Sequence, residues 1–316
     1  MAGSMGTLGG QDVVQAEVQK ALEGQSVDWR SRIWEGFLVL SLIVSFFFLT
    51  WLIVSQVIAS MPVWQERGVV DFLTSPTSSR AESAGISQAL FGSLIMMAIV
   101  SLLALPIGVA AAIYLEEYAP DNAVSRTLNT VIRNLAGVPA VVYGILGLAF
   151  FVIAAEPITG GRTVISGGLT LAVLVLPIAI IVTAEALRSV PASIREAGFG
   201  VGATRWEVIR SHVLPYAAPG IFTGIILTMA RAFGETAPLL LVGAVAGSFA
   251  TSDTASFIER LLGPYTSLPT IIYNWARQPG DGFRALTAAA IVVLLVVVLL
   301  INAVAIILRN RYARKW

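Results

Sequence analysis

The chain has 316 residues, and 56% of them are hydrophobic while only 12% are charged, so it has too little polar surface to cover a soluble globule of its size. A mean hydropathy of +0.82 indicates a protein solvated by lipid, and a net charge of +1 gives no broad basic face for nucleic acid. With no cysteine and one histidine, disulfides, thiolate metal sites and cysteine nucleophiles are excluded, and no metal site is expected.

Residues 1–32 form a polar segment that we assign to the cytoplasm. Acidic residues, including Asp12, Glu17 and Glu23, precede the first apolar run, so that run does not have the form of a signal peptide. We expect it to remain as an uncleaved span.

Six apolar runs are long enough to cross a bilayer core, which requires roughly 20 residues in a helix. They lie at 33–57, 86–115, 134–155, 167–187, 214–247 and 285–308. In lipid each run satisfies its backbone hydrogen bonds only as a helix, because the alternating pattern of barrel strands is absent. We therefore predict an all-α membrane domain over 33–308, followed by a cytoplasmic tail at 309–316.

The distribution of basic residues predicts the orientation of these spans. Of the 20 Lys and Arg residues, thirteen lie at the termini and in the loops on their side, six lie on the opposite side, and Arg231 lies inside a span. The richer side is expected to be cytoplasmic, with both termini on it.

Two outer connections follow from this orientation. Residues 58–85 are rich in Ser and Pro and are expected to form a solvated loop. The loop at 248–284 contains two short apolar stretches, 257–262 and 268–275, which we expect to be helices. Tyr273 and Trp275 favour anchoring at the membrane surface, and an outer gate or docking surface is the alternative.

A cytoplasmic connection, residues 188–215, contains residues typical of the starts and ends of two short helices, and we call it the hairpin. Pro191 suits the first turn of a helix, and Thr204 followed by Glu207 is a capping box that opens a second one. Phe199 and Val201 are then apolar side chains exposed outside the bilayer. Such a surface is typical of a contact with a partner protein, and an ordinary helical hairpin is the alternative.

The spacing within the hairpin resembles the EAA loop of bacterial ABC importer permeases. The matching residues are Glu196, Ala197, Gly198, Gly202, His212, Leu214 and Pro215. Gly198 replaces the usual second alanine, and His212 stands where isoleucine is common. The resemblance implies that the hairpin is the coupling element that enters a cleft of a separate ATPase subunit, and that the fold is the six-helix bundle of type I importers.

The sequence contains no GxxxxGK[ST] phosphate loop, because neither of its two lysines, Lys20 and Lys315, follows a glycine. The chain is therefore expected to be a non-catalytic subunit that binds no cofactor, with ATP and Mg²⁺ on the partner ATPase.

Two charged residues, Arg231 and Glu235, lie in the fifth apolar run, four residues apart and thus on one helix face. A charge at the bilayer centre costs about 3 kcal/mol, so these side chains must face protein or water. One interpretation is a structural ion pair. The other is that Arg231 borders an anion pathway, with paired donors that match phosphate oxygens, while Glu235 keeps the affinity low enough for release. Asn134 and Tyr143 are further candidates for the pathway, and Tyr143 has helix packing as its alternative.

The segment RAFGETAPLL around these charges, together with LAGVPAVVYGILG at 135–147, resembles the phosphate-specific permeases of ABC importers, and the ETAPLL ending resembles their A-type subunit. The resemblance covers about residues 86–308. It implies inorganic phosphate as cargo and a role in its passage for Arg231 and Glu235. It also implies an assembly in the bacterial inner membrane with a companion C-type permease, two copies of an ATPase and an external phosphate-binding protein.

Other functions remain as alternatives. A permease for phosphonate, molybdate or sulfate would keep the loop around Glu196 but would lack GETAPLL. An intramembrane enzyme would need a nucleophile, which Arg231 and Glu235 do not supply, and a channel that needs no ATPase would have no use for a coupling loop.

Overall fold

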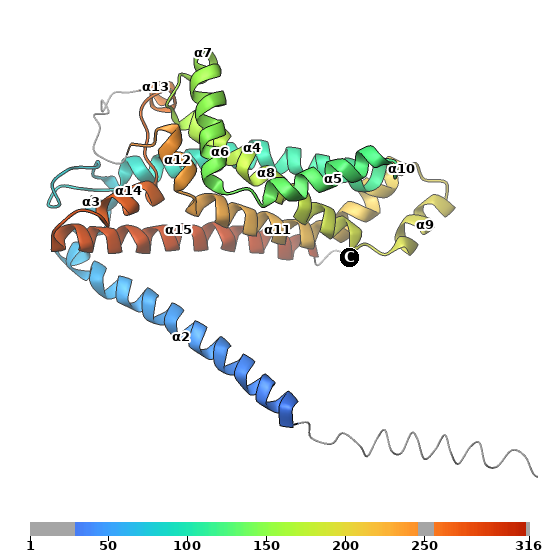
Figure 1. Cartoon of the computed structure of the whole chain (residues 1–316), viewed down its shortest axis with the longest axis horizontal. Coiled ribbons are helices and arrows are strands. Elements are labelled where there is room, and N and C mark those ends of the chain that lie inside the picture. Colours follow the sequence, from blue (N-terminus) through green and yellow to red (C-terminus); the bar gives the residue numbers. More distant parts are fainter. Residues whose placement is uncertain (1–28, 246–255, 314–316) are drawn as a thin grey trace, which may run out of the picture. The chain divides into compact units, whose positions relative to one another are not determined.

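A computed structural model describes residues 29–245 and 256–313 (Figure 1). Parts of four predicted segments lie outside these residues: 1–28 of the N-terminal segment, 246–247 of the fifth apolar run, 248–255 of the outer loop and 314–316 of the tail. The described residues are all-helical, as predicted. Two units make up the chain, residues 1–55 and 56–316, and helix α2 (Trp29–Glu66) carries the first apolar run.

The long helices of the second unit correspond to four of the predicted spans and part of a fifth. Their bounds are α4 (Ser87–Ile113), extended by a π-helical turn η1 (Tyr114–Tyr118), then α5 (Ala123–Ala136), α8 (Val164–Arg188), α11 (Leu214–Gly234) and α15 (Asp281–Ala313). Helix α8 packs against α4, α5 and α11, and α15 packs against α11. Among the residues that the structure describes, five helices are long and apolar enough to cross a membrane, and there are six such spans if one bent pair of helices counts as a span.

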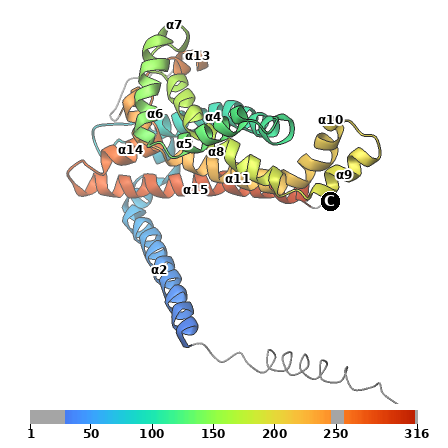
Figure 2. The ribbon, with the colours of Figure 1, turned by 45° about the vertical axis from the view of Figure 1, so that its right-hand side comes forward.

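Shorter helices connect or continue the long ones. They are α3 (Gly68–Thr74), α6 (Ala140–Gly147), the π-helical segment η2 (Leu148–Ala154), α7 (Glu156–Thr159), α9 (Ala192–Gly200), α10 (Arg205–Val208), the π-helical turn η3 (Ile209–Val213), α12 (Ala237–Val242), α13 (Phe257–Leu261) and α14 (Leu268–Trp275). Helices α9 and α10 project from one end of the bundle (Figure 2), which we call the hairpin end; the opposite end is the loop end.

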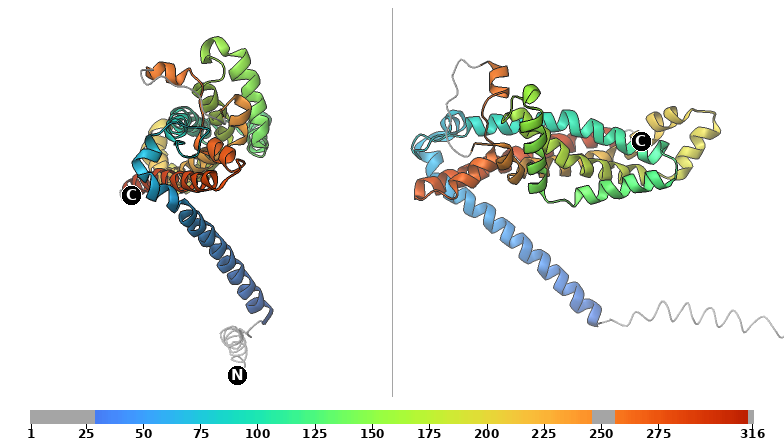
Figure 3. Two further views of the ribbon diagram at one scale, coloured as in Figure 1. Left: turned by 90° about the vertical axis from the view of Figure 1, so that its left-hand side faces the viewer. Right: turned by 45° about the horizontal axis from the view of Figure 1, so that its top comes forward.

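The third span is not the single helix expected at 134–155. It consists of α5 and the segment 140–154, which meet at an angle of 100° (Figure 3). Pro139 has no N–H for a continuous helix and disfavours helical geometry at Val138, and Gly137 adds flexibility to the same turn. The expectation of one continuous helix is therefore wrong, and the first half of this span, α5, begins eleven residues before the predicted start.

The fifth span also differs from the expected run at 214–247. Helix α11 ends at Gly234, because Glu235 has an extended backbone with ψ of 123°. A new short helix, α12, then begins with Pro238 in its first turn and ends at Val242, before Gly243, which has a left-handed φ of +106°. The single apolar run at 214–247 therefore contains two separate helices, α11 and α12, which hydropathy alone does not distinguish.

The connection at 58–85 is largely folded, so its prediction as a solvated loop is wrong. Helix α2 continues to Glu66, and Phe72 of α3 is fully buried between Trp64 and Trp275. Arg67 closes the connection by donating to the Ala84 carbonyl oxygen at 2.6 Å.

Both helices predicted in the outer loop are present as α13 and α14. Helix α14 is nevertheless not a surface anchor, because Trp275 is 2% exposed and packs against Phe72 and Phe283. The turn before α14 enters the bundle beside α4: a Cβ added at Gly92 would lie 2.1 Å from the Thr266 carbonyl oxygen. Long-range packing thus overrides the interfacial preference of Trp275, whereas Tyr273 is 46% exposed.

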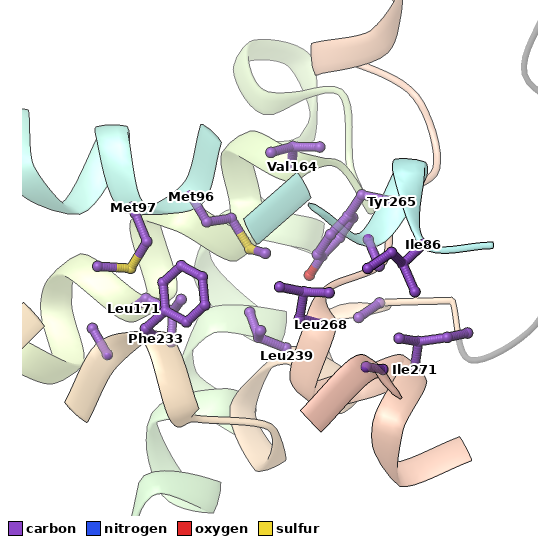
Figure 4. Packing of buried hydrophobic residues seen from close by; sticks show 14 of the residues in the cluster. Ile86, Met96, Met97, Val164, Leu171, Phe233, Leu239, Tyr265, Leu268 and Ile271 are labelled. Atoms are coloured by element: carbon purple, nitrogen blue, oxygen red, sulfur yellow. The ribbon is translucent and has the colours of Figure 1, made fainter. Parts of the chain in front are cut away.

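The core has two parts. The one toward the loop end joins α4, α8, α11, α12 and α14 and includes Met96, Leu171, Phe233, Leu239 and Leu268 (Figure 4). The other lies toward the hairpin end and joins α4, α8 and α11 to the hairpin through residues such as Leu187, Val208 and Val213. The hairpin is therefore packed onto the bundle by its own apolar residues.

Candidate functional site

The hairpin has the local structure that its sequence predicts. Helix α9 follows Pro191 and ends at Gly200, and Gly202 reverses the chain with a φ of +83°, a conformation that strongly favours glycine. The predicted capping box opens α10: the Thr204 hydroxyl accepts from the Glu207 N–H, and the Glu207 carboxylate accepts from the Thr204 N–H at 2.7 Å. Turn η3 then leads into α11 through Leu214 and Pro215, which are partly buried at that junction.

One side of the hairpin carries exposed side chains. Glu196 and Ala197 are exposed on α9, Phe199 is half exposed, and Val201 at the tip is 83% exposed. Trp206 of α10, which the sequence did not single out, is also half exposed. The apolar surface predicted outside the bilayer is therefore present.

Gly198 is buried between the two arms of the hairpin. A Cβ at this position would lie 2.8 Å from Cγ2 of Val208, closer than such contacts allow. The departure from the usual alanine is thus accommodated by a close approach of α9 to the helix that follows it.

Two ion pairs fasten the hairpin to α4, and sequence reasoning missed both. Arg195 of α9 pairs with Glu117 of η1 at 2.7 Å and also donates to the backbone carbonyls of Leu187 and Val190. Arg188, at the end of α8, donates from Nε to Glu116 Oε2 at 2.8 Å. The partners are more than 70 residues apart, and the only sequence signal was the adjacent Glu116 and Glu117 at the end of an apolar run. One pair thus joins α9 to η1, the extension of α4, and the other joins the end of α8 to the same turn.

Replacing Glu117 by alanine is expected to destabilise the protein by about 3 kcal/mol, because it leaves a largely buried guanidinium without its counter-charge. The measurement is thermal unfolding of the detergent-solubilised protein in its full assembly. Asp121→Ala is the matched control, since Asp121 pairs with Arg126 in an exposed ion pair. If both variants unfolded at the wild-type temperature, the Glu117–Arg195 pair would have no structural weight.

Arg231 and Glu235 lie together at the break between α11 and α12. The Nε of Arg231 is 3.5 Å from Oε1 of Glu235, and the side chains are 50% and 20% exposed. Glu235 lies one residue beyond the end of α11, so the contact spans the helix terminus. The two side chains are close, as predicted, but they do not share one helix face, because α11 ends before Glu235. The guanidinium is half exposed.

Arg231 belongs to an exposed stripe on α11. Its members recur at intervals of three or four residues: Tyr216, Gly220, Thr223, Leu227 and Arg231. Thr223 accepts a hydrogen bond from Arg309, which is the first charged residue after the apolar run of α15. Because Arg231 is eight residues farther along α11, it lies about 12 Å deeper than the level of Arg309. This depth agrees with an intramembrane position.

The opposite side of α11 faces packed protein. Ala232 and Phe233, next to Arg231 in sequence, line a cavity of about 10 Å³ together with Met96, Leu171 and Leu239. That volume holds at most one water molecule. The bundle is therefore packed beside Ala232 and Phe233, whereas the Arg231 side chain is half exposed.

The two remaining candidates lie at the bend of the third span. Asn134 is exposed in the last turn of α5. Tyr143 of α6 is buried, and its hydroxyl donates to the Leu135 carbonyl oxygen at 2.9 Å across the bend. Its position in the same core as Phe233 favours the packing interpretation for Tyr143.

Comparisons with known proteins place this fold and these residues in context. Residues 104–315 match the family model described as "Binding-protein-dependent transport system inner membrane component". A probable ABC transporter permease protein of Bacillus subtilis, YqgI, is 40% identical over 170 residues, which are 54% of this chain and 56% of that protein. The phosphate transport system permease protein PstA of Xylella fastidiosa is 32% identical over 77% of this chain and 81% of its own length. The chain thus spans little more than half of the first relative and most of the second.

Solved structures agree on the fold. A crystal structure of a bacterial alginate ABC transporter contains a chain that superposes with a TM-score of 0.61 at 18% identity, covering 87% of this chain and 93% of that one. The MetNI methionine ABC transporter has a similar chain with a TM-score of 0.57, also at 18% identity, over 72% of this chain and 95% of that one. At this identity the likeness concerns the fold alone.

Proposed function

The chain belongs to the family of binding-protein-dependent transport system inner membrane components, and from this premise we propose that it is the permease subunit of an ATP-driven importer of inorganic phosphate. The protein is a multi-pass subunit of an ABC transporter of the inner membrane. The observation that carries the choice of cargo is an intramembrane guanidinium, that of Arg231, which is half exposed on the outer face of α11. Its similarity to PstA proteins supports phosphate in particular.

The arrangement at Arg231 suits transient binding of an anion. The guanidinium remains charged and offers paired donors to oxyanions, and Glu235 neutralises part of that charge. A pathway conducts only if each contact is strong enough to admit the ion and weak enough to release it. Since the interior beside α11 is packed, the other wall of the pathway must come from a second permease subunit.

The assembly that we propose has a companion C-type permease, two copies of an ATPase subunit that hold ATP and Mg²⁺, and an external phosphate-binding protein. This chain binds no cofactor and catalyses no reaction. The exposed side of the hairpin, with Glu196 and Phe199, would contact the ATPase, and its buried side would transmit movement to α4 and α11. Both termini and the hairpin would be cytoplasmic.

The test is uptake of radiolabelled phosphate by membrane vesicles that contain the assembled transporter. We expect accumulation that requires ATP and the external binding protein, and we expect it to stop when the ATPase subunit is omitted. Excess unlabelled phosphate should abolish the signal, whereas sulfate, molybdate and phosphonate should not. Uptake that follows one of these other anions would transfer the assignment to that oxyanion, and uptake without ATP would refute an ABC importer.

A further inference from the structure

Helix α5 presents two different exposed faces. Val124, Leu128, Val131 and Leu135 form an apolar stripe with helical spacing, and all four are exposed. On the other side Thr127, Thr130, Arg133 and Asn134 form an exposed polar stripe. Between the two lies a row of less exposed residues, Ser125, Asn129, Ile132 and Ala136, and α5 packs against α8. The helix therefore borders two environments of opposite polarity.

The polar stripe reaches membrane depth, so Arg133, which the sequence analysis counted with the cytoplasmic loops, lies within the third span. Helix α5 follows η1, which Glu116 holds to Arg188 at the hairpin end of α8, and it continues lengthwise beside α8 (Figure 1). Arg133 is ten residues from the first residue of α5 and so lies about 15 Å from that end.

Arg231 lies at a comparable depth on the other helix that packs on α8. Gly224 lies directly against Val182, which is six residues before Arg188. Arg231 is seven residues beyond Gly224 on α11. The six-residue distance from Arg188 to Val182 along α8 and the seven-residue distance from Gly224 to Arg231 along α11 together place Arg231 about 20 Å from the hairpin end. The two arginines thus differ in depth by about one helical turn.

Their charges are compensated differently. Arg231 has Glu235 beside it, whereas Arg133 has no ion pair or hydrogen bond within the part of the chain that the structure describes. The Asn134 side chain, one residue farther, likewise has no hydrogen-bonding partner there. An intramembrane guanidinium does not remain in contact with lipid, so the polar stripe must border water or another protein.

We propose that the polar stripe of α5, centred on Arg133, is a second oxyanion-binding station of the transport pathway, separate from Arg231. The proposal rests on the proposed function, because an anionic cargo is what an uncompensated guanidinium in a water-filled route attracts. Two weak stations at neighbouring depths allow an ion to pass from one to the other without tight binding at either. The apolar stripe of α5 would face lipid or apolar protein.

The first experiment uses the absence of cysteine from this chain, which makes any introduced thiol unique on it. Arg133→Cys and Val131→Cys are compared in vesicles containing the assembled transporter, using a small anionic methanethiosulfonate reagent. Val131 is the matched control, because two residues along a helix place it on the opposite face at nearly the same depth. We expect the cysteine at 133 to be modified at least about ten-fold faster, since thiol modification depends on access to water. Equal rates, or a protected thiol at 133, would overturn the proposal and would indicate burial against another subunit or in lipid.

The second experiment measures ATP-driven phosphate uptake by Arg133→Gln and Arg133→Lys at saturating phosphate and equal amounts of assembled complex. Loss of a charged hydrogen-bond donor is expected to reduce uptake by about 10-fold or more, and lysine should restore most of the rate. ATP hydrolysis should continue, so that fewer phosphate ions are moved per ATP. Unchanged uptake by Arg133→Gln would overturn the second station while leaving the proposed function intact. If the wild type took up no phosphate, the proposed function would fail, and the labelling experiment would still decide whether the stripe borders water.

Discussion

Replacing Arg231 by alanine is expected to abolish phosphate uptake while the transporter still assembles. The side chain is half exposed and contributes nothing to the packed core on the far side of α11, so its removal should not unfold the protein. What is lost is a charged, two-pronged donor at about 12 Å beyond the level of Arg309, where few other groups can replace water around an anion. We expect the uptake rate to decrease by about 100-fold or more, the range associated with losing a strong charged contact.

The measurement is radiolabelled uptake in vesicles, normalised to the amount of complex recovered by affinity purification. Arg231→Lys should retain part of the activity, because a lysine keeps the charge but not the planar pair of donors. Arg80→Ala, which removes an exposed arginine from the connection between α3 and α4, should behave as wild type. Normal uptake by Arg231→Ala would remove this residue from the pathway and would leave the structural ion pair as its explanation.

Reversing the charge of Glu196 is expected to disconnect ATP hydrolysis from transport. Glu196 is exposed on α9, close in sequence to the apolar side chains at the hairpin tip, and it has no partner among the residues described in the structure. Glu196→Lys puts a positive charge into the proposed contact with the ATPase. That charge would either face another positive charge or remain without a counter-charge, and both arrangements weaken an interface strongly. We expect ATP-driven uptake to fall to background, while the isolated ATPase retains its own activity.

Uptake and ATP hydrolysis are measured side by side on the same vesicles to test this. Asp121→Lys supplies the control, because it reverses an exposed acidic residue at the hairpin end but outside the hairpin. Unchanged ATP-driven uptake by Glu196→Lys would mean that the coupling surface lies elsewhere. The two variants also separate two kinds of failure: Arg231→Ala should impair passage, and Glu196→Lys should impair its energisation.

The sequence predicted those features that depend on local composition. Uninterrupted apolar runs located α4, α8 and α15 to within a few residues at most ends, and the Thr204 and Glu207 pair located the start of α10. The proximity of Arg231 and Glu235 was expected from their spacing of four residues, although the helix that this spacing assumes ends between them. In each case the signal and the structure that it determines lie within a few turns of helix.

Features that depend on interruptions of an apolar run were missed. The bend after α5 had a visible signal, Gly137 and Pro139, but a search for long apolar runs passes over it. The same search excluded the first half of that span, because the polar stripe of α5 lowers its hydropathy. Polar residues at membrane depth are therefore the reason that α5 was not predicted as part of the third span, and they are also the feature that points to Arg133.

Features that depend on partners far apart in sequence were not predictable. Glu117 and Arg195 are separated by 78 residues, and neither residue shows locally that the other is its partner. Trp275 looked like an interfacial aromatic residue because its burial comes from Phe72 and Phe283, which belong to other segments. Only the assembled bundle determines which aromatic residue faces lipid and which fills the core.

The most direct test of the central claim is a structure of the assembled transporter with phosphate captured in transit. We predict phosphate density within hydrogen-bonding distance of the Arg231 guanidinium, in a water-filled cavity between this chain and its companion permease. A companion subunit packed tightly over Arg231, with no cavity and with its charge satisfied only by Glu235, would contradict the account.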